Sequence, residues 1–172
     1  MRFVETPILG AFVIEPEPVD DERGFFARIF DAAEFARRGL AASFPQWSIS
    51  YNARRGTLRG MHYQEAPHEE AKIVRCTRGA AHDVIVSLHD GRWSAVELSE
   101  ENRRALYIPA GVAHGFQTLA DATEMCYFIS AEYAPVSARG LRWNDPALAI
   151  DWPVADPILS ERDRSFPDFR RP

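Results

Sequence analysis

The stretch that decides the fold runs from residue 56 to residue 76 and reads GTLRGMHYQEAPHEEAKIVRC. Residues 56–64 and 71–79 both show the side-chain alternation and the flanking turn residues that are typical of β-strands. These strands nevertheless carry Arg59, His62 and Lys72, where the buried face of a strand usually holds valine or isoleucine. Polar side chains on the strands of a small barrel indicate an interior built for a ligand.

Most of the remaining chain also reads as short strands with turn residues between them. They lie at residues 10–16, 24–30, 46–52, 81–91, 92–100, 104–111, 114–120 and 123–130. This spacing predicts an antiparallel barrel or jelly roll. A single domain is expected over residues 1–172, with a proline-rich tail from about residue 134 that wraps around the barrel.

One segment, residues 31–40, has the pattern of a helix that flanks the barrel. Asp31 is placed to cap its start, Glu34 follows as the partner in a capping box, and Gly39 is placed to end it.

The composition limits the kinds of partner. The formal net charge of −5 argues against general binding of nucleic acid, which requires a basic face. No apolar run approaches the roughly 20 residues of a membrane span, and the first residues lack the pattern of a signal peptide, so a cytoplasmic protein is expected. Cys76 and Cys126 both lie in apolar runs and are expected to be free thiols.

Two charged residues are costly to place inside a barrel. The alternation puts Lys72 on the same face as Val74 and Cys76, so this lysine either extends to water at the end of its strand or has a partner inside. Asp83 begins an apolar strand and can equally be a turn or edge residue.

Two chemistries fit a polar interior with His62 and His114. A metal site could use these histidines together with Glu69 or Glu70, although the His-x-His pair of many metal-binding barrels here reads His62-Tyr63-Gln64. Metal-free proton transfer next to a carbonyl needs a base, a cation for the enolate and an acid on the opposite face. The chain offers His62, Lys72, and either Tyr127 or Tyr133 for these roles.

Six motifs in order resemble the dTDP-4-dehydrorhamnose 3,5-epimerase family over residues 3–168. They are DERGFF, GTLRGMHYQ, AKIVRCTRG, IPAGVAHGF, WNDPALAIDWP and LSERD. The resemblance implies a cupin-like jelly roll with one or two short peripheral helices, a homodimer, and no metal or other cofactor. It also implies an isomerase of deoxysugar biosynthesis that inverts C3 and C5 of a nucleotide-linked 4-keto-6-deoxyhexose.

The resemblance also implies roles for single residues. His62 would be the general base with Asp163 as its carboxylate partner, Lys72 would stabilise the enolate oxygen, and Tyr127 would return the proton on the other face. Residues that match substrate-holding positions are Arg23 and Arg59 for the diphosphate, and Phe26, Gln46, Ser48, His114 and Tyr133 for the rest of the nucleotide sugar.

Several positions depart from the pattern of the family. Arg28 and Ala138 stand where a glutamate is common, and Ser48 stands where an asparagine is usual. Ser87 and His89 replace an aspartate and an arginine. Because the proton-transfer set is intact and the substrate-holding shell is altered, we expect the same chemistry on an atypical nucleotide or sugar, or inversion at a single carbon. A metal-dependent isomerase or oxygenase and a non-catalytic sugar-nucleotide binding module are the alternatives.

Overall fold

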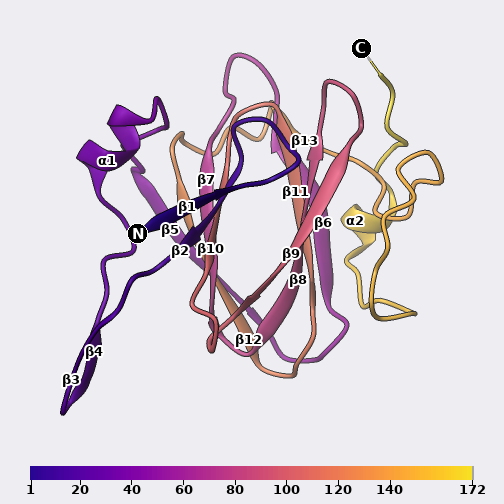
Figure 1. Ribbon diagram of the computed structural model, residues 1–172. Helices are drawn as coiled ribbons and strands as arrows, with labels where there is room; N and C mark the ends of the chain where they lie inside the picture. The colour runs from indigo at the N-terminus through magenta and orange to yellow at the C-terminus, as the bar shows by residue number, and fades with distance from the viewer. Residues whose placement is uncertain (172) are drawn as a thin grey trace.

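Two antiparallel β-sheets face each other and enclose the interior of a jelly-roll barrel, as predicted (Figure 1). The computed structural model describes residues 1–171. The six-stranded sheet has the order β1 (Arg2–Glu5), β2 (Phe12–Glu15), β10 (Ala105–Ile108), β7 (Lys72–Arg78), β12 (Thr123–Ile129) and β5 (Gln46–Asn52). The five-stranded sheet has the order β13 (Ala138–Gly140), β6 (Leu58–Gln64), β11 (Val112–Thr118), β8 (Ala80–Ser87) and β9 (Trp93–Ser99).

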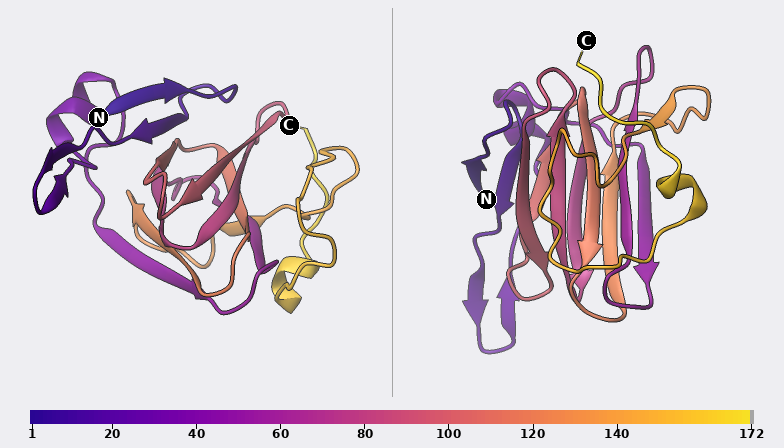
Figure 2. Two further views of the ribbon diagram at one scale, coloured as in Figure 1. Left: turned by 60° about the horizontal axis from the view of Figure 1, so that its bottom comes forward. Right: turned by 90° about the vertical axis from the view of Figure 1, so that its right-hand side faces the viewer.

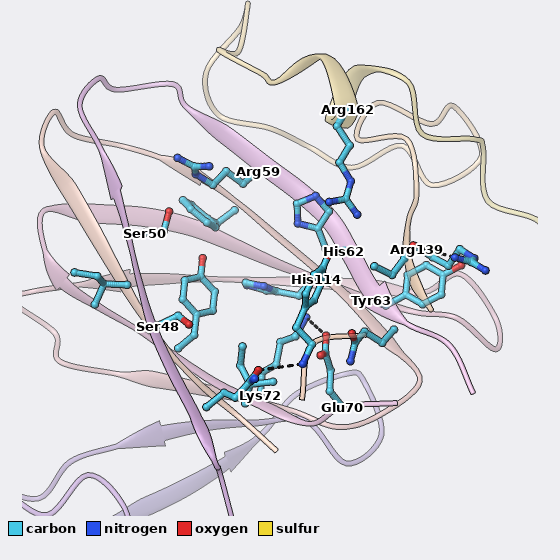
Figure 3. Close-up of a pocket in the computed structure, with 18 residues that line it drawn as sticks. Ser48, Ser50, Arg59, His62, Tyr63, Glu70, Lys72, His114, Arg139 and Arg162 are labelled. Carbon is cyan, nitrogen blue, oxygen red and sulfur yellow. Dashed lines mark hydrogen bonds and ion pairs between the residues drawn. The ribbon is translucent and has the colours of Figure 1, made fainter. Parts of the chain in front are cut away.

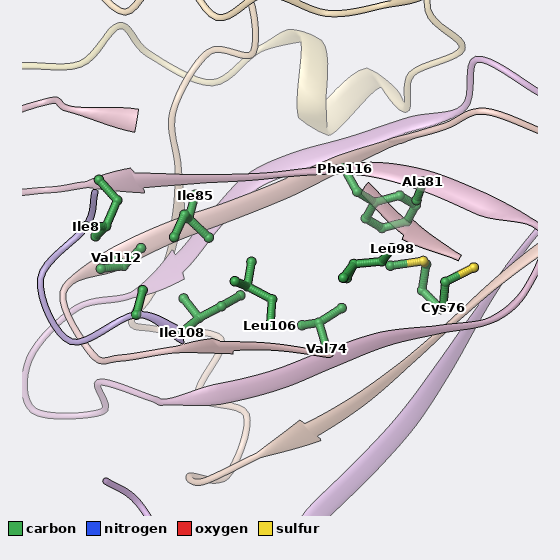
Figure 4. Packing of buried hydrophobic residues seen from close by; sticks show 12 residues of the cluster. Ile8, Val74, Cys76, Ala81, Ile85, Leu98, Leu106, Ile108, Val112 and Phe116 are labelled. Carbon is green, nitrogen blue, oxygen red and sulfur yellow. The ribbon is translucent and has the colours of Figure 1, made fainter. Parts of the chain in front are cut away.

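The alternation of side chains along the strands places an apolar core between the sheets. Val74 and Cys76 of β7 point inward and meet Ile85 of β8 and Phe116 of β11, all of them buried (Figure 4). Each fully buried aliphatic or aromatic side chain contributes about 1.5–3 kcal/mol to folding. Lys72 precedes Val74 by two residues on the same strand, so the strand that supplies the core also carries the lysine inward.

Both cysteines are free thiols, as expected. Burial raises the pKa of the Cys76 thiol to about 11 and also raises the pKa of Cys126. Neither thiol is therefore activated as a nucleophile.

Helix α1 (Ala32–Arg37) begins and ends as its sequence predicts. The side chain of Asp31 accepts a hydrogen bond of 3.1 Å from the backbone N–H of Glu34. Gly39 follows the helix with φ +70°, a conformation that glycine adopts without strain. The helix buries Phe35 against the ring of Tyr107, and so covers the outer face of the six-stranded sheet.

A two-stranded hairpin, β3 (Val19–Asp21) and β4 (Gly24–Phe26), projects from the barrel beside the N-terminus (Figure 1). The strand predicted for residues 24–30 ends at Phe26. The chain leaves the hairpin there and turns toward α1, where Arg28 forms an ion pair of 2.9 Å with the capping carboxylate of Asp31.

The C-terminal segment runs over the outer face of the five-stranded sheet (Figure 2). Leu148 and Ile150 pack against Val84 and Val86 of β8. The segment then forms a second short helix, α2 (Glu161–Arg164), which lies against β6. Among residues 1–171, no helix has the length and apolar character needed to span a membrane.

Candidate active site

One part of the barrel interior is an open cavity of about 360 Å³ that is lined mostly by polar residues (Figure 3). The strands that line it are β5, β6, β7, β11, β12 and β13. Eight predicted site residues meet there: Gln46, Ser48, Arg59, His62, Lys72, His114, Tyr127 and Tyr133. The cavity also contains lining residues that were not predicted as part of the site, among them Ser50, Tyr63, Gln64, Arg139 and Arg162.

His62 on β6 is paired with Asp163 on α2, the ninth predicted residue that the structure brings to the site. Nε2 of the imidazole lies 2.8 Å from Oδ1 of the carboxylate. The side chain of Asp163 is buried, whereas 40% of the His62 side chain is exposed toward the cavity. A carboxylate only accepts, so Nε2 carries the proton and Nδ1 keeps a free lone pair. The pair therefore has the geometry of a general base held in one tautomer.

A second histidine–carboxylate pair lies deeper in the barrel. Nε2 of His114 lies 3.0 Å from both carboxylate oxygens of Asp83, and both side chains are buried. Asp83 is therefore neither a turn nor an edge residue. Its inward position was not evident from the sequence because β8 is apolar on both faces, so the alternation did not show which face Asp83 occupies.

Lys72 points into the cavity from the first position of β7. Its ammonium forms an ion pair of 2.7 Å with Glu70, and only 9% of the residue is exposed. The alternative of a lysine that extends to water is therefore wrong. The sequence did contain a signal for this partner. Glu70 precedes Lys72 by two residues, and side chains at that spacing on a strand point to the same face.

Tyr127 on β12 lies beside His114, with ring centroids 6.1 Å apart. Burial is the main cause that raises the pKa of its phenol well above the usual value, and the carboxylate of Asp83 adds to it. Tyr127 therefore stays protonated at neutral pH and can donate a proton.

Arg59 and His62 reach the same cavity although they are three positions apart on β6. In a regular strand, an odd separation places two side chains on opposite faces. The pairing of β6 with β11 shifts in register between His114 and Phe116, and this irregularity brings both side chains to the cavity. Arg59 is held by Asn52, whose Oδ1 accepts a hydrogen bond of 2.8 Å from Nε.

Arg23 and Phe26, the remaining two residues of the predicted set, do not line this cavity. Both lie on the projecting β3–β4 hairpin, where Arg23 pairs with Asp21 and Phe26 is 71% exposed. The hairpin extends away from the barrel of its own chain (Figure 1).

The positions that depart from the family pattern fall into two groups. Ser48 and Ala138 line the cavity. Ser87 and His89 lie at the turn between β8 and β9, and Arg28 lies near α1. These three residues are not part of the cavity wall.

The side chains that line the cavity do not form a cluster suited to a metal ion. Within residues 1–171, no group of three or more His, Cys, Asp or Glu side chains converges on one point. The proposed ligands His62, Glu70 and His114 each have a different partner, and the exposed Glu69 does not line the cavity.

The comparisons with known proteins agree with this geometry. The sequence profile of the dTDP-4-dehydrorhamnose 3,5-epimerase family matches residues 5–171. The chain belongs to this family. Its members are epimerases, which are isomerases, so the family and the enzyme class predicted from the motifs are confirmed.

A dTDP-4-dehydrorhamnose 3,5-epimerase of Methanothermobacter thermautotrophicus is 43% identical, over 98% of this chain and 95% of the relative. The crystal structure of dTDP-6-deoxy-D-glucose-3,5-epimerase from Legionella pneumophila in complex with dTDP-4-keto-L-rhamnose has a TM-score of 0.89 and 35% identity, covering 98% and 92% of the two chains. ChmJ, a 3'-monoepimerase from Streptomyces bikiniensis in complex with dTDP-quinovose, has a TM-score of 0.87 and 34% identity, covering 95% and 86%.

Proposed function

We propose that this protein epimerises a nucleotide-linked 4-keto-6-deoxyhexose of the dTDP-4-dehydro-6-deoxyglucose type, at C3 and C5, in deoxysugar biosynthesis. The observation that carries the proposal is the His62–Asp163 pair, at 2.8 Å, beside a cavity that also holds an ammonium and a neutral phenol. Each inverted carbon lies next to the ketone, so its proton is acidic enough for a histidine base when the enolate is stabilised.

The reaction follows from the placement of these groups. Nδ1 of His62 removes the proton next to the ketone, and Asp163 stabilises the imidazolium that forms. The ammonium of Lys72 stabilises the negative charge on the enolate oxygen. Tyr127 then delivers its proton to the opposite face of the same carbon. The proton on His62 passes to solvent, and Tyr127 is reprotonated from solvent, which returns the enzyme to its starting state.

The substrate-holding roles are part of this proposal. Arg59, fixed by Asn52, offers a guanidinium to a diphosphate oxygen. Gln46 is oriented by the backbone N–H of Tyr133, which donates to its side-chain oxygen at 3.2 Å. Tyr133 lines the cavity and is 58% exposed, so its ring is available to contact the nucleotide. Ser48 and His114 complete the predicted set along the cavity wall.

A homodimer is also part of the proposal, because it gives Arg23 and Phe26 a site. The hairpin exposes Val19 and Phe26 by 70% and 71%, and the outer face of β5 exposes Trp47 by 71%. Large apolar side chains exposed in this number mark an interaction surface. In a symmetric dimer, the hairpin of one copy can supply Arg23 and Phe26 to the cavity of the other.

A mixing experiment tests this arrangement. The double variant Arg23→Ala/Phe26→Ala and the single variant His62→Ala are each expected to lack epimerase activity. Subunits mixed under exchange conditions should regain activity, since one of the two cavities then has an intact His62 and an intact hairpin. If the hairpin serves its own chain, mixing restores nothing.

Inversion at a single carbon is the second candidate. Ser48 and Ala138 line the cavity with shorter side chains than the family pattern has at these positions, which changes how the sugar is held. The similarity to ChmJ, a 3'-monoepimerase, favours the same possibility. Cytoplasmic location belongs to the proposal as well, and the two free thiols agree with a reducing compartment.

Exchange in deuterated water tests the function directly. The protein is incubated with dTDP-4-keto-6-deoxyglucose in D₂O, and C3 and C5 of the sugar are followed by NMR, with His62→Ala as the control. Deuterium at both carbons supports the 3,5-epimerase, and deuterium at one carbon supports the single-carbon enzyme. Absence of exchange with folded wild-type protein would contradict epimerisation of this substrate.

A further inference from the structure

Lys72 is the only lysine of the chain, whereas the other nineteen of its twenty Lys and Arg residues are arginines. A protein that uses arginine at every other cationic position has a lysine at this one. Arginine presents a broad planar fork, while lysine presents a compact ammonium on a flexible four-carbon chain. The compact ammonium fits beside a single oxygen atom, but the flexible lysine side chain needs a hydrogen-bond acceptor that fixes its position.

The strand itself does not hold the ammonium. Lys72 lies in the middle of the six-stranded sheet, with Ile108 of β10 and Ile129 of β12 as its two cross-strand neighbours. Aliphatic neighbours offer no hydrogen-bond acceptor from their side chains, and a charge in such surroundings is costly unless it is paired. The ion pair with Glu70 supplies the partner that the neighbouring strands do not.

Glu70 is itself held in place by the residue between the two partners. The backbone N–H of Ala71 donates to Oγ of Ser130 at 2.8 Å, and the backbone N–H of Ser130 donates to the carbonyl of Ala71 at 2.9 Å. These two bonds attach the start of β7 to the end of β12. The Glu70 side chain is only 10% exposed, so its carboxylate stays at the cavity wall.

We infer that Glu70 is a positioning residue that fixes the ammonium of Lys72 for the enolate oxygen, an inference that rests on the proposed function. Two other carboxylates serve the site, and each is bound to a histidine: Asp163 to His62, and Asp83 to His114. Glu70 gives the ammonium a carboxylate of its own (Figure 3). The lysine is thereby kept from competing for the carboxylates that orient the two histidines.

The single lysine permits a direct test, because protein labelled with ¹³C at lysine Cε gives one side-chain signal. In wild-type protein the two Hε protons are expected to differ in chemical shift, since a held side chain does not average them. In Glu70→Gln, which keeps the size and removes the charge, they are expected to merge. Glu69→Gln changes the exposed neighbouring acid and is expected to leave the signal unchanged.

Activity provides the second readout. Glu70→Gln should lower kcat about tenfold or more, with KM within about twofold of wild type, because a misplaced catalytic charge affects the transition state more than the bound substrate. Glu70→Asp should recover part of kcat, and Glu69→Gln should match wild type.

Two results would overturn the inference: a kcat in Glu70→Gln equal to or above that of wild type, or a loss of kcat with an unchanged lysine signal. Failure of the proposed function is distinguishable, since wild-type protein would then exchange no deuterium. The lysine signal of Glu70→Gln would still decide whether Glu70 holds Lys72.

Discussion

Nε2 of His62 lies 2.8 Å from Oδ1 of Asp163, although the two residues are 101 positions apart in the sequence. His62 comes from the barrel, whereas Asp163 comes from helix α2, which lies within the C-terminal segment. The backbone N–H of Asp163 also donates to Oγ of Ser160, which fixes the first turn of this helix. The C-terminal segment therefore supplies the carboxylate partner of a cavity histidine and also covers the sheet.

Asp163→Asn should lower the rate of deuterium exchange by about 10²–10⁴, because an amide can donate to Nε2 and so favour the wrong tautomer of His62. Exchange at the sugar carbons measured by NMR, together with nucleotide affinity from calorimetry, separates catalysis from binding. Asp168→Asn, at an exposed acid paired with Arg142, is the control and should retain the wild-type rate. Equal rates in both variants would remove Asp163 from the mechanism.

His62→Ala should abolish deuterium exchange and leave nucleotide binding nearly unchanged. The arginines and aromatic side chains provide most of the ground-state affinity, so the loss falls on the chemical step. Calorimetric titration with dTDP measures the binding. A large loss of affinity would mean that His62 holds the substrate.

Tyr127→Phe should slow inversion more than exchange. A proton can leave and return on the face of His62 without the opposite acid, whereas inversion requires a donor on the other face. Product formation and deuterium entry are followed in the same NMR experiment. Tyr51→Phe, on the exposed face of β5, serves as the control. Equal losses of inversion and exchange in Tyr127→Phe would argue against its role as the acid.

Gly60→Ala should destabilise the fold and reduce activity. Gly60 has φ +148°, and a Cβ there would lie 2.6 Å from Cα of Gly115 on the neighbouring strand β11. The backbone of β6 must then move, two residues before His62. Gly111→Ala is the control. Gly111 also has a positive φ, +80°, but a Cβ there would have no atom within 4 Å, so this variant measures only the conformational cost of about 1–2 kcal/mol. Urea unfolding should show a larger loss for Gly60→Ala, and a smaller one would contradict the close approach of the two strands.

Stability should fall below about pH 6.5 because of His82. Burial lowers the pKa of His82, although Asp83, Asp151 and Glu97 act in the opposite direction. The unfolded chain therefore takes up the proton first as the pH falls through its usual value of about 6.5. Protonation then favours the unfolded chain. The free energy of unfolding therefore keeps its full value above that pH and decreases as the pH falls below it.

Urea midpoints at pH 8 and pH 5.5 measure this effect. His82→Gln should show a smaller drop between the two pH values than wild type, whereas His89→Gln, at an exposed position, should show the same drop as wild type. The same drop in His82→Gln and wild type would show that His82 does not cause the pH dependence.

The sequence predicted the regular elements better than the contacts between them. Alternation identified the strand that carries Lys72, and local capping identified α1, because both signals lie within a few neighbouring residues. The partner of His114 could not be identified, since β8 is apolar on both faces. The approach of Arg59 to the cavity depends on a register shift between two strands, which no local pattern records. The placement of Arg23 and Phe26 depends on where a hairpin extends in space.

The position of β5 at the edge of its sheet has an evolutionary consequence. Gln46 and Ser48 lie on this strand, which is bonded only to β12, while Lys72 and His114 lie on strands with a neighbour on each side. Substitutions on a border strand disturb fewer neighbours than substitutions in the middle of a sheet. Under the proposed function, preference for a new sugar or nucleotide can therefore arise by mutation of β5 while the reaction chemistry is inherited intact. Directed evolution toward unnatural substrates would then begin at Gln46 and Ser48.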